Sequence, residues 1–226
     1  AGTEADDAVA YRGRDDWLFL VSEIRALANP PTPGPVPDDP GADPFSSIVD
    51  LNGKLQKLGI ELILLPAPPR AAIYADKLLD DVPRDANGRL TRVDDGLQAF
   101  YHALEAEGVR VLDLADTFLA ARAADEERGP VSCEQDTHWS PRGVRLAAVA
   151  VASVVKKMDW ARELKPVGLH RKTPVKINYV GDLVERVPGH AQTYSSAVLE
   201  RIVASADSDE KVESDPASPI ILLADS

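Results

Sequence analysis

Residues 44–65 read PFSSIVDLNGKLQKLGIELILL, and this stretch decides the fold class. The spacing predicts a helix over residues 44–58, because its large apolar residues recur every three or four positions. Gly59 ends the helix, and an apolar run over residues 60–65, closed by Pro66, predicts a strand buried on both faces. A helix, a glycine and then a fully apolar strand indicate an α/β protein with a mainly parallel central sheet.

The same order recurs further along the chain. Residues 91–107 have helical spacing, Gly108 ends them, and residues 109–112 form the next expected strand. Helices are also predicted over residues 115–128 and 140–157. Ser140 suits the cap of the latter helix and Pro141 its first position. A last apolar strand is expected over residues 219–223 (PIILL).

The chain is expected to form one domain, residues 1–226, and its remaining segments fall outside the helix–strand pattern. Trp17, Leu18 and Phe19 predict a short buried strand or a docking segment. Residues 29–44 hold seven prolines, which excludes a helix or a central strand and predicts an irregular loop. The other expectations are a small extended or hairpin-like insertion within residues 165–190, a helix over residues 191–204 and a solvated loop over residues 204–218.

Composition excludes several classes of protein. The chain has 226 residues, with 37 acidic against 25 basic side chains and a net charge of −12, which argues against general nucleic-acid binding. Cys133 is the only cysteine, so the chain has no internal disulfide and no cysteine-based zinc site. The apolar runs are shorter than the roughly 20 residues that cross a membrane. No metal site and no cofactor are predicted.

The most informative string for chemistry is residues 133–143, CEQDTHWSPRG. Asp136 and His138 are two positions apart just before a predicted helix, so in an extended segment both side chains point the same way. A carboxylate in that place fixes the tautomer of the imidazole ring and raises its basicity, as a general base requires. The alternative is that Asp136 caps a turn and His138 packs beside Trp139.

A second string ends the chain. Ser226 follows Asp225 directly after the predicted strand of residues 219–223, and α/β proteins place active sites at the carboxyl ends of such strands. A serine hydroxyl needs a base to become a nucleophile. The alternative is a strand that simply ends in a polar turn.

Taken together, these strings resemble the alginate O-acetyltransferase (AlgX/AlgJ-like) family of the SGNH hydrolase-like superfamily. Four segments carry the resemblance, in order: GRDDWLFL at residues 13–20, PAPPR at 66–70 with IYADKL at 73–78, DTHW with Gly143 at 136–143, and a Gly181-Asp182-Leu183 element with a terminal Asp225-Ser226. The resemblance covers residues 11–226, and DTHW is its most specific part.

The resemblance implies an SGNH-like three-layer fold and a catalytic triad of Asp136, His138 and Ser226. This motif order is permuted relative to familiar SGNH enzymes, in which the serine comes first. It implies transfer of acetyl groups onto hydroxyls of an exported polysaccharide through an acyl-serine. The acetyl donor would be a membrane-bound acyltransferase, and the location the periplasm or cell surface, with any anchor outside this chain.

Two other functions stay open on the residues alone. A carbohydrate acetylesterase would use the same triad with water as acceptor, and a non-catalytic glycan-binding or scaffold module would use none of it. Candidate substrate contacts are Arg70, Tyr74 and Trp139, with structural roles as alternatives. A basic stretch, residues 156–176 with seven bases and two acids, is either a groove for an anionic glycan or a solvated face.

Two positions depart from the family pattern, and both concern backbone conformation. Ala224 and Asp16 each replace a glycine, so each is expected to keep a negative φ angle. Oxyanion donors in this superfamily come partly from segments after the serine. Either the native chain continues past Ser226, which is the expectation, or this copy is not a competent enzyme.

Overall fold

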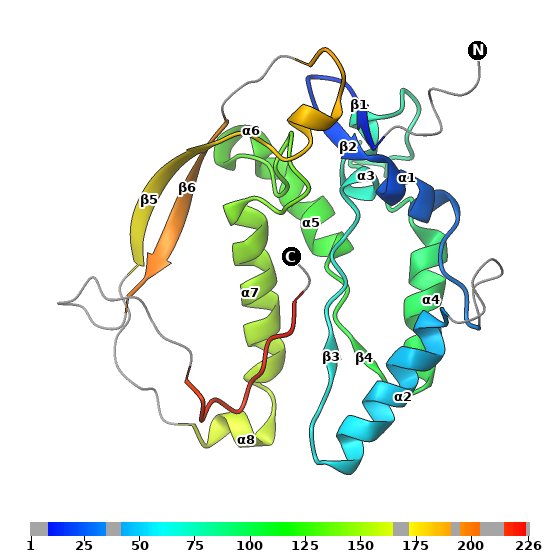
Figure 1. The fold of residues 1–226 in the computed structure, drawn as a ribbon, viewed down its shortest axis with the longest axis vertical. Helices are drawn as coiled ribbons and strands as arrows, with labels where there is room; N and C mark the ends of the chain where they lie inside the picture. Colours follow the sequence, from blue (N-terminus) through cyan, green and yellow to red (C-terminus); the bar gives the residue numbers. More distant parts are fainter. Residues whose placement is uncertain (1–8, 35–41, 165–171, 191–194, 204–214, 225–226) are drawn as a thin grey trace.

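The computed structural model describes residues 9–34, 42–164, 172–190, 195–203 and 215–224 (Figure 1). Its centre is a parallel pair of strands, β3 (Ile63–Leu64) and β4 (Arg110–Val111), with Ile63 opposite Arg110. The sequence predicts this parallel pair correctly. Each strand is shorter than the predicted run of apolar residues, because only two residues of each form ladder pairs.

Helices flank the parallel pair on both sides and give three layers (Figure 1). One side carries α2 (Pro44–Lys57) and α4 (Asp95–Ala106), and the other side carries α5 (Ala115–Ala121) and α7 (Pro141–Val155). The other helical segments of the described residues connect or extend these elements: α1 (Val21–Ala28), α3 (Arg70–Ile73), η1 (Ala75–Lys77), η2 (Arg122–Ala124), α6 (Asp125–Arg128), α8 (Asp159–Arg162) and η3 (Val184–Arg186).

Local capping chemistry fixes where the long helices begin. The Asp43 carboxylate accepts a hydrogen bond from the Ser46 N–H at 2.8 Å, and Pro44 opens α2. Ser140 caps α7 in the same way. Its hydroxyl accepts a hydrogen bond from the Gly143 N–H at 3.2 Å, and Pro141 is the first residue of the helix. A capped helix start with proline at the first position is encoded within a few residues, so both predictions are confirmed.

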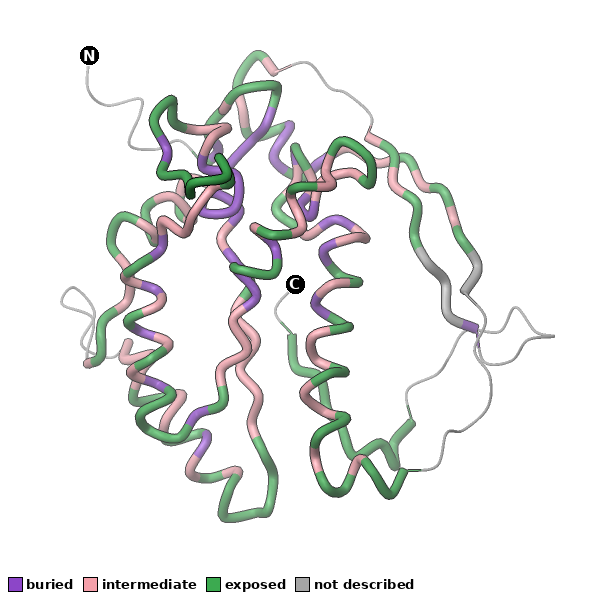
Figure 2. The backbone as a smooth tube through the Cα atoms, turned by 180° about the vertical axis from the view of Figure 1, so that it is seen from behind, coloured by how far each residue is buried: buried purple, intermediate pink, exposed green. Residues whose placement is uncertain are grey.

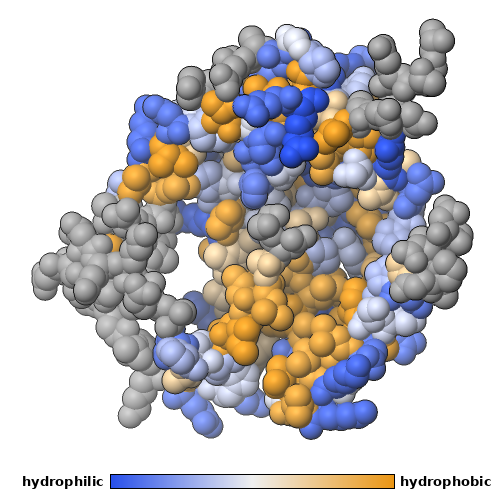
Figure 3. Space-filling view, viewed as in Figure 1, coloured by the Kyte–Doolittle hydropathy of each residue, from blue (hydrophilic) through white to orange (hydrophobic). Residues whose placement is uncertain are grey.

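The terminal strand prediction is wrong. Residues 219–223 form no strand in the described part of the chain, and the side chains of Ile220, Ile221, Leu222 and Leu223 are between 47% and 87% exposed. Figure 3 shows hydrophobic side chains gathered in the lower half of the face that it presents. An apolar run becomes a buried strand only where a neighbouring strand pairs with it. Here the described sheet containing β3 and β4 has two strands, so a mainly parallel, larger sheet is not formed.

The insertion is a long antiparallel hairpin of β5 (Lys172–Tyr179) and β6 (Ser195–Ile202), with Tyr179 opposite Ser195. It lies outside α7 (Figure 1). The insertion predicted within residues 165–190 contains β5, but its partner β6 lies beyond those bounds, and the helix predicted over residues 191–204 is wrong across β6. Each strand pairs with residues far away in the sequence, and local spacing cannot show that pairing.

A second hairpin joins β1 (Ala10–Arg12) and β2 (Leu18–Leu20). Its tight turn closes with the Trp17 N–H donating to the Arg14 carbonyl at 3.0 Å, and φ is +53° at Asp15 and +59° at Asp16. The expectation of a negative φ at Asp16 is wrong. Two positive φ angles define a type I′ turn, in which Asp-Gly is preferred and a second aspartate is tolerated at a cost.

The main core lies at the carboxyl ends of β3 and β4. Its fully buried members include Phe19, Ile73, Phe118 and Val131, with Trp17 stacked on Tyr74 at 4.0 Å between ring centroids. Figure 2 shows buried segments in purple at the upper end of the molecule and at intervals along the long helices. The core therefore supports the loop that follows α6, which carries Asp136 and His138.

Candidate active site

The loop of residues 131–140 connects α6 to α7 and folds back on itself. Ser132 and Trp139 form an antiparallel bridge, the Cys133 N–H donates to the His138 carbonyl at 3.1 Å, and the Ser140 N–H donates to the Val131 carbonyl at 3.0 Å. Gly143 lets α7 approach this loop, since a Cβ there would lie 2.1 Å from the Val131 carbonyl oxygen. The loop base is thus fixed, and residues 134–137 form its tip.

Asp136 and His138 are in direct contact at this tip. Asp136 Oδ1 lies 2.6 Å from His138 Nδ1 and also accepts the His138 backbone N–H at 3.0 Å. The His138 side chain is 65% exposed, whereas that of Asp136 is 13% exposed. The expected hydrogen bond is present, and it favours the tautomer with the proton on Nδ1. Nε2 is then the nitrogen that can accept a proton at the surface.

Hydrogen bonds keep Asp136 ionised in spite of its burial. Burial alone would raise the pKa of this carboxyl. The His138 backbone N–H, the His138 ring and the Asp182 backbone N–H outweigh burial, so the pKa of Asp136 is lowered. A carboxylate that stays charged is the form that orients an imidazole and stabilises an imidazolium.

Asp182, which follows the β5–β6 hairpin's first strand, completes this arrangement. Its carboxylate accepts the Thr137 N–H at 2.8 Å and the Thr137 hydroxyl at 2.5 Å, and its own N–H donates to Asp136 Oδ2 at 3.1 Å. The sequence pattern alone predicts no role for Asp182. The available signal was its place in a Gly-Asp-Leu element directly after a segment rich in β-branched residues.

Ligand atoms of Asp136, His138 and Asp182 lie within 4.8 Å of one another, a spacing at which a metal ion could bind. All four carboxylate oxygens of this group accept hydrogen bonds from the protein. Hydrogen bonding therefore accounts for the close approach of these three side chains.

Arg70 is a structural part of the site. Only 4% of the residue is exposed, and its Nη1 donates to the Cys133 carbonyl at 2.8 Å and to the Asp136 carbonyl. Burial lowers the pKa of Arg70, and the nearby Glu23, Asp182 and Asp136 oppose that shift. Glu23 in turn accepts the Arg70 backbone N–H, and burial raises the pKa of this carboxyl. Arg70 thus ties the loop to α3, and its proposed contact with substrate is not supported.

Tyr74 and Trp139 also face inward. Tyr74 is 1% exposed, donates its hydroxyl hydrogen to Asp125 at 2.9 Å and accepts the Val131 N–H at 2.9 Å, and burial raises its pKa. Trp139 packs against the core with its ring edge-on to Phe118 at 5.4 Å. For both residues, the structure supports the structural alternative.

Cys133 is half-buried beside the site. Its thiol contacts Tyr179 of β5 and the Trp139 carbonyl, and burial raises the pKa of the thiol. A neutral thiol is a poor nucleophile, so a packing role suits this cysteine. Tyr179 gives the hairpin a second contact with the loop.

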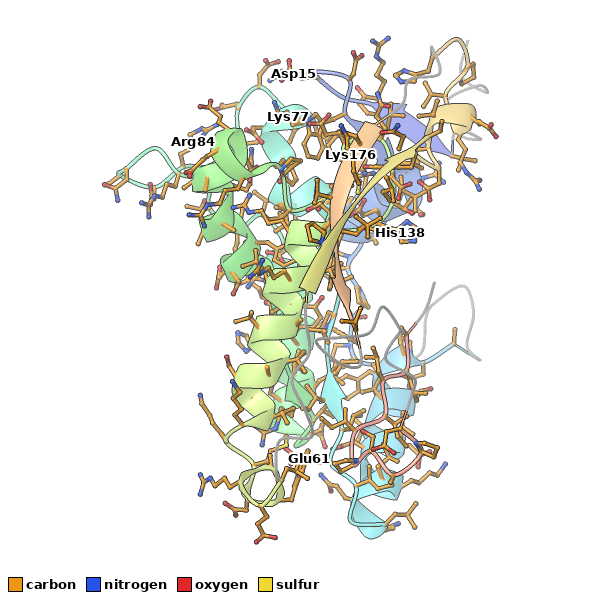
Figure 4. All side chains as sticks on the ribbon, turned by 90° about the vertical axis from the view of Figure 1, so that its left-hand side faces the viewer. Asp15, Glu61, Lys77, Arg84, His138 and Lys176 are labelled. Atoms are coloured by element: carbon orange, nitrogen blue, oxygen red, sulfur yellow. The ribbon has the colours of Figure 1, made fainter. Side chains whose placement is uncertain are left out.

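Ser226 lies outside the described residues. The same holds for residues 165–171 in the middle of the basic stretch. Figure 4 places His138 towards the end of the molecule opposite Glu61, which precedes β3. His138 is therefore near the carboxyl ends of the parallel strands, the edge where the sequence predicts the active site.

Comparison with known families identifies the chain's relatives. The sequence model described as "SGNH hydrolase-like domain, acetyltransferase AlgX" matches residues 10–225. The chain belongs to this AlgX family. The resemblance predicted from the DTHW block and its companion motifs is confirmed.

Curated relatives carry a consistent name. A "Probable alginate O-acetylase AlgJ" of Pseudomonas syringae pv. tomato is 27% identical over 177 residues, and one of Pseudomonas putida is 26% identical over 176 residues. The matches cover 78% of this chain but 40% and 41% of the relatives. The chain therefore spans about two fifths of their length.

Solved structures show the same fold. The O-acetyltransferase domain of Pseudomonas putida AlgJ superposes with a TM-score of 0.59 at 23% identity, covering 87% of this chain and 66% of that one. Pseudomonas aeruginosa AlgX gives 0.60 at 19% identity, with 85% and 43% covered. Among the described residues of this AlgX-family chain, no helix is long and apolar enough to span a bilayer.

Proposed function

We propose that this chain is the acetyl-transferring domain of an enzyme that modifies hydroxyls of an exported polysaccharide. The observation that carries the proposal is the 2.6 Å contact between Asp136 Oδ1 and His138 Nδ1, beneath a ring that is 65% exposed. An oriented imidazole at the surface can serve a large substrate that approaches from outside. Membership of the AlgX family supports acetyl transfer as the reaction.

The first half of the reaction loads the enzyme. His138 Nε2 takes the hydroxyl proton of Ser226 while the serine oxygen attacks the acetyl carbonyl carbon of the donor. Asp136 stabilises the imidazolium that forms. The donor's leaving group then departs with that proton, and the acetyl ester remains on Ser226.

The second half transfers the acetyl group. His138 removes a proton from a sugar hydroxyl, whose oxygen attacks the acetyl carbon on Ser226. The bond to the serine oxygen breaks, and the serine regains its proton from the imidazolium. The products are an acetylated polysaccharide and free enzyme, and no cofactor is needed.

The relatives' name suggests alginate, or a similar polyuronate, as the acceptor. A membrane-bound acyltransferase as donor and a periplasmic or cell-surface location complete the proposal. The motif order Asp136, His138, Ser226 makes this domain a permuted member of the SGNH-like group.

The decisive experiment measures acetyl release from a chromogenic acetyl ester by the full-length protein. His138→Ala and Ser226→Ala should both abolish release. His102→Ala is the matched control, because His102 is an exposed histidine of α4 that pairs with Glu105 at 3.0 Å. Release by His138→Ala at the wild-type rate would remove the proposed base.

A second assay separates the transferase from its rivals. Incubation with an oligouronate acceptor should yield acetylated oligosaccharide by mass spectrometry at the expense of free acetate. Acetate alone would indicate an esterase. Binding of the oligosaccharide without either product would indicate a glycan-binding module.

A further inference from the structure

Two segments that are 45 residues apart interlock at the candidate site. A Cβ on Gly181 would lie 2.0 Å from the Gln135 carbonyl oxygen, so the two backbones are packed directly together. The Leu183 N–H donates to the same carbonyl at 3.3 Å, and the Leu183 side chain is fully buried. The start of the 181–183 segment is thus anchored against the loop tip on both sides of Asp182.

Asp182 uses this position to hold two consecutive residues of the loop. Its carboxylate accepts hydrogen bonds from the Thr137 N–H at 2.8 Å and from the Thr137 hydroxyl at 2.5 Å. Its own backbone N–H donates to Asp136 Oδ2 at 3.1 Å. Asp136 Oδ1 is held separately by His138. The Asp136 carboxylate is therefore fixed at both oxygens, one by the imidazole and one by the 181–183 segment.

From these contacts we infer that Asp182 is a positioning residue for the Asp136–His138 pair. This inference rests on the proposed function. Asp182 touches no reacting atom, and it acts by fixing Thr137 and Asp136, which in turn fix the His138 ring. The loop tip lies outside any helix or strand. Backbone N–H groups of Leu18 and Leu183 hold the carbonyls of Glu134 and Gln135, whereas the hydrogen bonds described at Asp136 and Thr137 involve side chains.

The size of the effect follows from the sensitivity of catalysis to placement. A displacement of about 1 Å in a catalytic group can lower the rate about 100-fold without loss of binding. Removing the Asp182 carboxylate frees Thr137 but leaves the backbone N–H that faces Asp136. The expected result is a drop in kcat of about 10- to 100-fold, no larger than the loss from a displacement of about 1 Å, with little change in KM.

Three variants and one control test the inference. Asp182→Ala removes both contacts to Thr137, and Thr137→Val removes only the hydroxyl contact, so its effect should be smaller. Asp182→Asn keeps the shape and one acceptor for the Thr137 N–H, so it should restore most of the kcat lost in Asp182→Ala. Glu185→Ala is the control, because Glu185 is an exposed carboxylate on the neighbouring η3.

A readout that does not depend on acetyl transfer is also needed. Nitrogen NMR of histidine-labelled protein reports which ring nitrogen of His138 carries the proton, with His138→Ala assigning the signal. Wild type should show a dominant Nδ1–H tautomer, and Asp182→Ala should show mixed tautomers or broadened signals. Glu185→Ala should match wild type.

The outcomes separate the two proposals. If the wild type releases no acetyl group, the proposed function fails, and the His138 tautomer still decides the role of Asp182. An unchanged tautomer together with an unchanged kcat in Asp182→Ala would overturn the inference. A loss in Asp182→Asn as large as in Asp182→Ala would overturn positioning by hydrogen bonds. If Asp182→Ala does not fold, Thr137→Val supplies the test, and an unchanged tautomer together with an unchanged kcat in that variant would overturn the inference.

Discussion

The site loop and the terminal segment, residues 215–224, form a sharp contrast. The polar loop is held by three residues from two regions: Arg70 at the start of α3, Tyr179 at the end of β5 and Asp182 just after β5. The hydrogen bonds of the terminal segment are local, such as the Ile220 N–H to the Ser218 hydroxyl at 3.2 Å. Its apolar side chains remain exposed.

This difference separates the two halves of the proposed triad. The histidine half is already arranged for chemistry within the described residues. The segment leading to Ser226 gains little stability from its apolar residues while they face water, because stabilisation requires removal of apolar area from solvent.

The largest expected effect is on catalysis through Asp136. Asp136→Asn keeps the shape of the side chain but presents an amide that no longer favours the Nδ1–H tautomer of His138. Acetyl release should fall by up to about 10⁴-fold, the benchmark for a triad aspartate. The measurement is kcat for a chromogenic acetyl ester with the full-length protein.

His102→Ala again provides the reference, since it alters a histidine outside the loop. An Asp136→Asn variant that works within a few-fold of wild type would show that the 2.6 Å contact has no catalytic role. The contrast between an organised loop and an unorganised terminal segment would then have no functional meaning.

The next effect is on stability, through the close packing of Gly181 on the loop. Gly181→Ala places a methyl group against the Gln135 carbonyl, which should destabilise the protein by about 1–3 kcal/mol. Gly53→Ala is the matched control, because a Cβ on Gly53 in α2 meets no atom within 4 Å. Its expected effect is a gain of up to about 1 kcal/mol. Urea unfolding of both variants checks the pair, and equal stabilities would contradict the interlock.

The sequence predicts those parts of the molecule whose determinants are local. Ser140 and Pro141 identify the start of α7, and the D-x-H spacing identifies a contact between Asp136 and His138. The strand β6 was misassigned because its partner β5 is distant in the sequence. Asp182 was missed for the same reason, since its contacts with Thr137 depend on the path of the whole hairpin.

A pH-dependent effect follows from the lowered pKa of Asp136. A carboxyl whose pKa is lower in the folded than in the unfolded chain stabilises the fold above the unfolded value of about 3.9. That stability is lost as the pH falls through the folded pKa. The difference in unfolding free energy between wild type and Asp136→Asn should therefore be largest near neutral pH and shrink below about pH 4. Urea titrations across this range measure it, and a difference that grows on acidification would reverse the assigned sign.

A smaller effect is expected at the β1–β2 turn, which supports the loop through the Leu18 N–H and the Glu134 carbonyl at 2.9 Å. Asp16→Gly relieves a positive φ of +59° and should stabilise the protein by about 1 kcal/mol. Loss of the exposed ion pair between Arg12 and Asp16 offsets this gain only slightly. Thermal unfolding should show a higher Tm, and a lower Tm would mean that the aspartate side chain outweighs the backbone strain.

The smallest effect tests the terminal segment directly. Leu222 is 82% exposed, so Leu222→Ala should change the free energy of unfolding by less than about 0.5 kcal/mol. Leu18 is fully buried in β2, and Leu18→Ala, which removes the same atoms, should cost about 2–5 kcal/mol. Urea unfolding of the two variants of the 226-residue chain gives the comparison. Equal losses of unfolding free energy would mean that Leu222 is buried in solution. The apolar run of residues 219–223 predicts such burial. The terminal segment would then be an ordered strand, and the contrast with the site loop would disappear.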